Sequence, residues 1–396
     1  MKTIDQFNFN NQRVLIRVDY NVPLNDQFDI TDDTRITATL PTLNKILGDG
    51  GSLVLMSHLG RPKSGPEHKF SLVHLQKSLA SALNTEVLFA NDCIGEKAFD
   101  LSKNLKSGEV LLLENLRFYK EEEQGSEDFA EKLSKHGDFY VNDAFGTAHR
   151  AHASTAVIAK FFPTAKAFGY VMASEIENVS RVLNSTEKPV TAIIGGAKVS
   201  SKITIIENLL PRVNHLIIGG GMAYTFSKAL GGKTGNSLVE DDFVATAADI
   251  LSKAKAMGVE VHLPVDSLNA RSFSNDAETC ISPANEIEDG WMGLDVGPAT
   301  SNLFAEVVGK SRVILWNGPV GVFEFDHFAQ GTKHLGQAIA KATAHGAFSL
   351  VGGGDSVAAA KQFGLDTQVS YVSTGGGAML EYLEGRSLPG IDAILN

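Results

Sequence analysis

Glycine clusters directly after short apolar runs constrain the fold of this chain more than any other feature. Residues 348–363 read FSLVGGGDSVAAAKQF, an apolar strand followed by three glycines, an aspartate and a helix. The same design recurs in TAIIGG ending at Gly196, HLIIGGG ending at Gly221 and SYVSTGGG ending at Gly377. The carboxyl ends of parallel strands lie along one edge of an open sheet, so these clusters predict one shared, glycine-lined surface.

Such a surface favours phosphate binding. Glycine backbone lets a phosphate approach the amide hydrogens, and the helix that follows adds the positive end of its dipole. Asp355, beside the last of the GGG glycines, has two interpretations. Its position suits a helix N-cap, and its carboxylate also suits the Mg²⁺ that accompanies nucleotide phosphates. The local pattern favours the cap, whereas the repeated glycine clusters favour the cation.

Composition places the chain among ordinary globular proteins. Its 396 residues predict two or three domains, and we expect two. No stretch has the apolar length of a membrane span, and the N-terminus lacks the basic start and apolar core of a secretory signal. Only Cys93 and Cys280 are present, which fits a reducing cytoplasm and supplies no metal-ligand cluster.

Charge restricts the class of ligand. The formal net charge of −11 argues against general nucleic-acid binding, which depends on an excess of lysine and arginine. Any anionic ligand therefore needs a local basic cluster. The partners expected are small molecules, with neither nucleic acid nor membrane among them.

The first half alternates apolar runs with helical patterns, which predicts βαβ units and a parallel sheet. The runs are RVLIRVDYNVPL, SLVLMSHLG, EVLFA, EVLLLENLRFY and DFYVNDAFGTAHRAHAS. A proline damages a helix interior, so Pro41 argues against a helix that begins as early as Asp32. The helix ending near Gly48 should therefore begin late, which leaves Arg35 in the loop before it.

Polar residues follow these strands where each one ends. If the sheet is parallel, they form one basic group at its edge, although each arginine taken alone is an ordinary surface residue. The HRAH segment lacks cysteine or carboxylate neighbours and is not expected to bind metal. The acidic run at 121–123 is interpreted as a solvated face without a role. The strand-end residues are Asp19, Asn21, His58, Arg61, Arg117, His149, Arg150 and His152, with Arg35 beside them.

The second half repeats the strand, turn and helix order after a helical connector within residues 168–189. In PVTAIIGGAKVSSKITIIENLL, the apolar residues Ile203, Ile206 and Leu210 define one helix face. Lys198 and Lys202 stand four apart at the predicted helix start. Like charges there are mildly unfavourable, so either an anionic partner explains them or they lie on a wet face.

Three further patterns limit the chemistry. In RVILWNGPVGVFEF, the glycines and proline after a strand offer a slot for a planar base, with Glu324 able to accept from ribose hydroxyls, or simply form a turn. The GKT at 232–234 is not a P-loop, because Ser227 stands where that motif requires its first glycine. No cluster completes the G-x-G-x-x-G fingerprint of nicotinamide enzymes.

The motifs RVDYNVPL, SHLGRP, LENLRF, NDAFGTAHRAHAS, GGAKVSSK, WNGPVGVFE, GGGDS and VSTGGGA together resemble those of phosphoglycerate kinases over essentially the whole chain. The resemblance implies two Rossmann-like, doubly wound parallel-sheet domains, joined by a helix and closing about a hinge. Residues 1–170 would bind 3-phosphoglycerate, joined by a returning tail at 378–396. Residues 171–377 would bind Mg-ADP or Mg-ATP.

The resemblance also implies site residues. Tyr371 and Ser356 depart from residues frequent in the family, histidine and threonine respectively, without altering a role. Asp355 would lie close to the metal. The catalytic residues would be Arg35, Lys198, Lys202 and Gly376. The glycerate site would comprise Asp19, Asn21, Arg35, His58, Arg61, Arg117 and Arg150. The nucleotide site would comprise Gly195, Gly196, Lys198, Lys202, Gly219, Asn317, Pro319, Glu324, Gly353, Gly354, Asp355 and Ser356.

The activity implied is reversible phosphoryl transfer from 1,3-bisphosphoglycerate to Mg-ADP. The exchanging oxygens are already anionic at neutral pH, so alignment and charge neutralisation replace a general base. Two rival classes remain to be separated by an assay for ADP formation. A two-lobed anion-binding protein is disfavoured by the missing export signal, and a nicotinamide dehydrogenase by the missing fingerprint. We expect a cytoplasmic monomer.

Overall fold

The chain folds into two compact units in this computed structural model, which describes residues 1–63 and 65–396. Unit 1 comprises Met1–Ile176 with Ser387–Asn396, and unit 2 comprises Glu177–Arg386. The division falls inside helix α6 (Tyr170–Leu183), a little later than the boundary expected at residue 170. In the described chain, no helix combines the length and the apolar character that a membrane crossing requires.

Unit 1 is built on a six-stranded sheet in which every neighbouring pair is parallel. The strand order is β3-β4-β2-β1-β5-β6. The strands are β1 (Arg13–Val18), β2 (Ser52–Met56), β3 (Val87–Ala90), β4 (Val110–Leu113), β5 (Phe139–Asp143) and β6 (Lys166–Phe168). The helices between them are α1 (Thr34–Gly48), α2 (Val73–Leu83), α3 (Glu96–Lys103), α4 (Lys120–Glu123) and α5 (Glu127–Ser134).

Burial explains why the strands of unit 1 read as continuous apolar runs. Every residue of β2, β4 and β5 is buried, as expected for parallel strands covered on both faces. Val14, Ile16 and Leu55 belong to one core cluster with side chains of α1 and α2. Each such aliphatic side chain contributes about 1.5–3 kcal/mol when removed from water.

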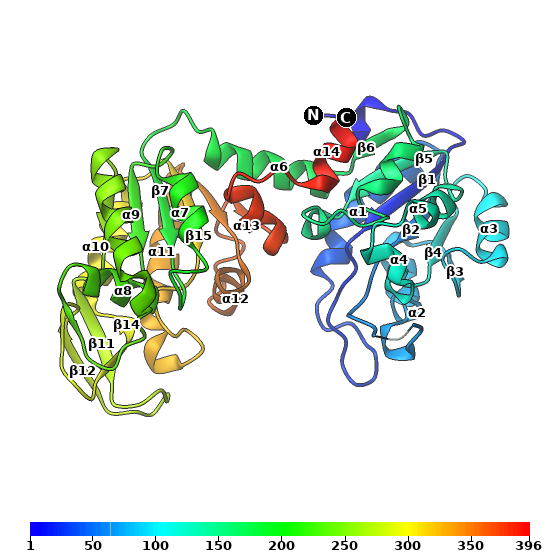
Figure 1. Ribbon diagram of the computed structural model, residues 1–396. Helices are drawn as coiled ribbons and strands as arrows, with labels where there is room; N and C mark the ends of the chain where they lie inside the picture. The colour runs from blue at the N-terminus through cyan, green and yellow to red at the C-terminus, as the bar shows by residue number, and fades with distance from the viewer. Residues whose placement is uncertain (64) are drawn as a thin grey trace. The chain divides into compact units, whose positions relative to one another are not determined.

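The end of the chain completes unit 1. Helix α14 (Pro389–Leu395), drawn red in Figure 1, lies beside β6 and close to the N-terminus. Lys166 Nζ donates to the Ala393 carbonyl at 2.8 Å, and the Gly390 amide donates to the Ala148 carbonyl at 2.8 Å. The C-terminal stretch that belongs to unit 1 begins at Ser387 and not at residue 378 as expected. The reason is that α13 (Gly377–Leu383) packs on α7 (Ile203–Leu209) of unit 2.

Unit 2 has a second six-stranded parallel sheet, in the order β10-β8-β7-β15-β16-β17. The predicted fold class, two parallel-sheet α/β units, is therefore confirmed. The strands are β7 (Val190–Ile194), β8 (His215–Ile218), β10 (Glu260–His262), β15 (Val313–Asn317), β16 (Phe348–Val351) and β17 (Tyr371–Val372). Besides α7 and α13, the helices are α8 (Met222–Ala229), α9 (Val244–Ala256), α10 (Pro298–Gly309), α11 (Gln330–Ala344) and α12 (Gly354–Gln362).

Unit 2 also contains small sheets that the sequence did not predict. An antiparallel sheet has the order β12-β11-β14 (Figure 1). Separately, β13 pairs with β9. The antiparallel sheet has a core of its own, in which Ala270, Leu294 and Phe328 are buried. The five strands are β9 (Lys233–Thr234), β11 (Asp266–Ala270), β12 (Thr279–Pro283), β13 (Glu286–Ile287) and β14 (Met292–Val296).

Candidate functional site

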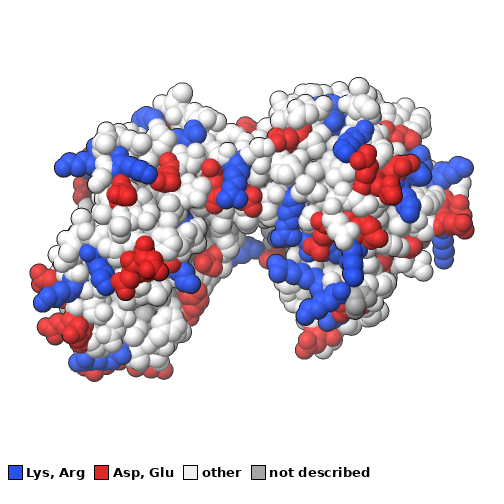
Figure 2. Space-filling model, in the orientation of Figure 1, with Lys and Arg blue, Asp and Glu red and all other residues white. Residues whose placement is uncertain are grey.

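Most of the predicted basic group lies at one edge of the unit 1 sheet. Strands β4, β2, β1 and β5 are consecutive neighbours with the same direction, so the loops after them leave the same edge. On the face drawn in Figure 2, basic and acidic side chains are interspersed and no broad basic surface is seen. The loops carry Asp19 and Asn21 after β1, His58 and Arg61 after β2, Arg117 after β4, and Arg150 after β5.

Arg35 reaches this edge from α1, which corrects the prediction that it lies in a loop. The helix runs without interruption from Thr34 through Pro41. Pro41 is exposed, whereas Ile36, Leu43 and Ile46 are buried on the other side of the helix. A proline inside a helix costs about 3 kcal/mol. The three buried side chains contribute about 1.5–3 kcal/mol each, so packing outweighs the lost hydrogen bond.

Asp19 orders the centre of the basic group. Its carboxylate pairs with the Arg35 guanidinium and lies 3.9 Å from His58 Nδ1. It also accepts from the Asn21 amide at 3.3 Å, while Asn21 Oδ1 accepts from the Gly60 amide at 2.8 Å. Burial opposes ionisation of Asp19, but His58, Arg35 and Arg17 together lower its pKa below the ordinary value. The ionised carboxylate therefore fixes the Arg35 guanidinium, whereas burial lowers the pKa of His58 well below its ordinary value.

Arg17, which the sequence analysis did not select, lies fully buried beneath this edge. Its Nε donates to Ser154 Oγ at 2.8 Å, and its Nη2 lies 3.2 Å from His58 Nδ1. The sequence does contain a signal for Arg17, because it is an arginine inside the apolar run RVLIRV. A charge buried in such a strand requires a partner elsewhere in the chain. Arg17 supports His58 from below and does not reach the exposed surface.

Glu122 supplies a negative charge near the buried Arg17. The burial of Glu122 corrects the interpretation of the acidic run at 121–123 as a solvated face. The side chain is fully buried, whereas Glu121 and Glu123 are exposed. Its carboxylate accepts from the Ser154 amide at 3.0 Å and from Ser154 Oγ at 2.5 Å. Burial raises its pKa, and the Arg17 charge opposes that rise. Ser154 thus connects the two buried charges.

The remaining arginines differ in exposure. Arg117 Nη1 donates to the Gly60 carbonyl at 2.9 Å, and its Nε lies 3.4 Å from Glu123. Arg150 is half-buried with its Nε 3.2 Å from His149 Nε2, and Arg61 is exposed. Burial lowers the pKa of Arg117, so an anion that neutralises it would be favoured. The edge therefore offers several guanidinium donors, which suit carboxylate and phosphate oxygens.

In unit 2, the predicted glycine clusters do share one edge. They follow β7, β8, β16 and β17, which are parallel members of one sheet. A Cβ added to Gly195 would lie 2.1 Å from the Pro319 carbonyl, and one added to Gly219 would lie 2.4 Å from Val320 Cγ1. Gly318 has φ +111°. These positions require glycine because a neighbouring backbone at Gly195, and the Val320 side chain at Gly219, leave no space for a side chain.

Lys202 is held at this edge by Asn317. Its Nζ donates to Asn317 Oδ1 at 2.7 Å, and Asn317 Nδ2 donates to the Gly352 carbonyl at 2.7 Å. Burial lowers the pKa of Lys202, while Asp355 and Glu384 act in the opposite direction. Asn317, the last residue of β15, is itself buried. The Asn317 side-chain amide thus connects the GGAKVSSK segment to the GGGDS segment.

Two local predictions here were wrong. Lys198 and Lys202 are not one helical turn apart, because α7 begins only at Ile203 and Lys198 lies exposed in the preceding loop. Asp355 is not the N-cap of α12, because Gly353, with φ +92°, occupies that position. Asp355 instead lies exposed in the first helical turn. Its carboxylate is therefore free of the capping role that the local pattern favoured.

The other predicted nucleotide residues surround this edge. Ser356 is buried, and its Oγ accepts from the Gly318 amide, a bond that needs only the hydroxyl it shares with threonine. Pro319 is buried and Glu324 is exposed. Gly376, with φ +50°, is the N-cap of α13. A cavity of about 730 Å³ in unit 2, lined in part by Tyr224, lies elsewhere and contains none of the predicted nucleotide residues.

Comparisons with known proteins agree along the whole chain. A phosphoglycerate kinase of Porphyromonas gingivalis is 54% identical over 99% of this chain and 99% of its own length. A protein of Triticum aestivum described as cytosolic phosphoglycerate kinase is 50% identical over 99% of this chain and 97% of its own length. The solved phosphoglycerate kinase of Coxiella burnetii superposes with a TM-score of 0.91 at 42% identity, covering 99% of this chain and 98% of its own. A family model described as phosphoglycerate kinase matches residues 4–386, and the chain therefore belongs to the phosphoglycerate kinase family.

Proposed function

We propose that the two units divide the reaction of a phosphoglycerate kinase between them. The protein transfers a phosphoryl group reversibly from 1,3-bisphosphoglycerate to ADP, giving 3-phosphoglycerate and ATP. Unit 1 binds the glycerate substrate and unit 2 binds the nucleotide. The observation that carries this division is the contrast between the two sheet edges, since one gathers guanidinium groups and the other gathers bare glycine backbone.

At the unit 1 edge, Asp19 holds Arg35 and His58 in place, and Asn21 fixes the loop that carries Arg61. The guanidinium groups neutralise the carboxylate and the phosphate of the substrate. The glycerate site consists of Asp19, Asn21, Arg35, His58, Arg61, Arg117 and Arg150.

At the unit 2 edge, the nucleotide phosphates lie against the glycine backbone and the N-terminus of α12. Pro319 and Glu324 contact the base and the ribose. Lys202, positioned by Asn317, and Lys198 neutralise phosphate charge. The nucleotide site consists of Gly195, Gly196, Lys198, Lys202, Gly219, Asn317, Pro319, Glu324, Gly353, Gly354, Asp355 and Ser356.

The residues of unit 2 fit a magnesium ion that arrives with the nucleotide. Mg²⁺ in such sites is held by one or two carboxylates and by substrate phosphates. Asp355 supplies an exposed carboxylate beside the glycines that would cradle the phosphates. When bound, the ion neutralises the charge that develops on the transferring phosphoryl oxygens.

Transfer breaks the bond between phosphorus and the acyl oxygen of 1,3-bisphosphoglycerate and forms a bond to a β-phosphate oxygen of ADP. Both oxygens are anionic when free, so no side chain has to remove a proton. Arg35, Lys198, Lys202 and the amide of Gly376 stabilise the charge on the group in flight. Because the two ligands bind to different units, we propose that the units close on each other during the reaction.

We also propose that the enzyme works as a cytoplasmic monomer. Cys93 and Cys280 are free thiols, which suits a reducing compartment. The activity is tested by mixing the purified protein with 3-phosphoglycerate and Mg-ATP and following ADP. Substrate-dependent ADP formation is expected, and a protein that binds both ligands without forming ADP would contradict the proposal.

A further inference from the structure

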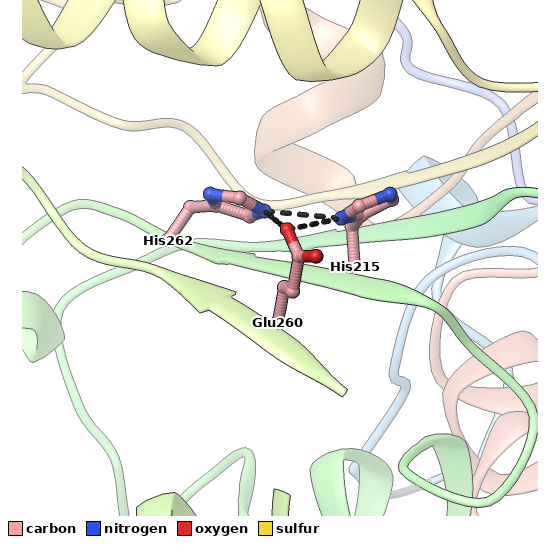
Figure 3. A group of neighbouring side chains, drawn as sticks. All are labelled: His215, Glu260 and His262. Carbon is pink, nitrogen blue, oxygen red and sulfur yellow. Dashed lines mark hydrogen bonds and ion pairs between the residues drawn. The ribbon is translucent and has the colours of Figure 1, made fainter. Parts of the chain in front are cut away.

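Two histidines and a glutamate meet on one face of the unit 2 sheet, at its β10 border. His215 begins β8, and Glu260 begins β10 at the border of the sheet. Glu260 pairs directly with His215, and side chains two apart on a strand point to the same face, so His262 joins them. Figure 3 shows the three side chains converging from the two strands.

The distances among the three ligand atoms match a metal site. His215 Nδ1 lies 3.2 Å from His262 Nε2 and 3.5 Å from Glu260 Oε2, and His262 Nε2 lies 3.9 Å from the same oxygen. A triangle with these sides has a circumscribed radius of about 2.1 Å, so one point lies at that distance from all three atoms. Zinc bonds to imidazole nitrogen and carboxylate oxygen are about 2.0–2.2 Å long.

We propose that His215, Glu260 and His262 bind a Zn²⁺ ion at the edge of the unit 2 sheet. Two imidazoles and one carboxylate select zinc and its neighbours in the first transition row over Mg²⁺, which prefers oxygen ligands alone. At the point equidistant from the three ligand atoms, the ion would lie in their plane, so the Glu260 carboxylate must shift slightly toward the histidines to give the tetrahedral geometry in which water takes the fourth position. Glu260, whose side chain is 71% exposed, can adjust its carboxylate to the ion. The bound ion ties the border strand β10 to β8.

Calorimetric titration of the metal-free full-length protein with ZnCl₂, without nucleotide, tests the proposal. One zinc per chain should bind. Loss of an outer-shell partner already lowers metal affinity by about 10- to 100-fold, so His262→Gln and Glu260→Gln, which remove direct ligands, should lower it at least that much. His345→Gln is the matched control, because His345 is an exposed histidine at the end of α11. It should bind zinc like the wild type.

Two further readouts separate this site from other sources of zinc binding. Co²⁺ added to the wild type should give the visible absorption of a four- or five-coordinate ion, and His262→Gln should abolish it. Zinc should raise the melting temperature of the wild type and not that of Glu260→Gln, whose exposed side chain leaves the fold intact. Equal zinc affinity in wild type and His262→Gln, or binding lost in Cys280→Ser and kept in the histidine variant, would overturn the proposal.

Discussion

Lys202 is held in place by an amide that is itself anchored to the backbone. The chain from Lys202 Nζ through Asn317 to the Gly352 carbonyl positions the ammonium group before any ligand arrives. Because Lys202 is partly buried, folding has already removed part of the water around its ammonium group, and less has to be removed when the ligands bind. We therefore expect Lys202 to act on the phosphoryl group in flight more than on either bound ligand.

Lys202→Ala should lower kcat on the order of 10²-fold or more, about 3 kcal/mol, since it removes one preorganised charge-stabilising donor. The KM values should change far less. Steady-state kinetics measures both, with circular dichroism to verify folding. Lys310→Ala, at the exposed C-cap position that follows α10, is the control and should leave kcat unchanged. A folded Lys202→Ala enzyme with normal kcat would show that Lys202 does not stabilise the phosphoryl group in flight.

Glu122 balances a buried positive charge. Glu122→Gln keeps the shape of the side chain but removes one of the two carboxylates that act on the Arg17 guanidinium, the other being Asp19, which should destabilise unit 1 by about 1–3 kcal/mol. Glu121→Gln alters the exposed neighbour and should stay within about 0.5 kcal/mol of the wild type. Urea unfolding of the two variants makes the comparison. Equal midpoints would mean that Glu122 does not compensate Arg17.

Residues at strand ends are easier to predict from sequence than the buried residues beneath them. A strand end is a local feature, so His58 and Asp19 could be selected from alternation alone. Arg17 instead bonds Ser154, which is 137 residues away, and Glu122 bonds the same serine from helix α4. No local pattern contains such a pairing, and it becomes visible only when tertiary burial is known.

At the scale of secondary structure, tertiary packing decided the predictions that were wrong. Pro41 is an unfavourable residue inside α1, yet the buried face of that helix outweighs its cost. Lys198 lies in a loop because the glycine turn after β7 continues to Lys202 before α7 begins. The small sheet of β11, β12 and β14 was missed because its short strands lack the apolar runs that identified the two parallel sheets.

A buried carboxyl connects β14 to α11 and gives unit 2 a predicted pH dependence. Asp295 accepts from the Val296 amide at 2.8 Å and from the Gly331 amide at 2.9 Å. Burial raises its pKa to about 7, although those hydrogen bonds oppose the rise. The folded protein then retains a proton that the unfolded chain releases near pH 3.8, so this group lowers stability as the pH rises from about 4 to about 7.

Asp295→Asn removes this titration. As the pH rises from about 4 to about 7, the free energy of unfolding of the variant should increase relative to that of the wild type. Each pKa unit of the shift corresponds to about 1.4 kcal/mol. Urea unfolding at a series of pH values measures the difference. Asp276→Asn, at an exposed loop position between β11 and β12, should follow the wild type throughout. A constant difference between Asp295→Asn and wild type would show that Asp295 does not titrate in this range.

For the whole molecule, the division of ligands between units predicts a change in dimensions. With both ligands bound, the units should close, and the radius of gyration should fall further than with either ligand alone. Small-angle scattering with 3-phosphoglycerate, with Mg-ADP and with both measures this effect. A ternary complex with the radius of the free protein would argue against closure.

The central claim is that unit 1 binds the glycerate substrate and unit 2 the nucleotide, and calorimetry of two single-site variants tests it most directly. Arg61→Ala should weaken 3-phosphoglycerate binding and leave Mg-ADP binding unchanged, because its guanidinium is an exposed donor at the unit 1 edge. Asp355→Ala should do the reverse. Loss of Mg-ADP binding in Arg61→Ala, or of 3-phosphoglycerate binding in Asp355→Ala, would contradict the account.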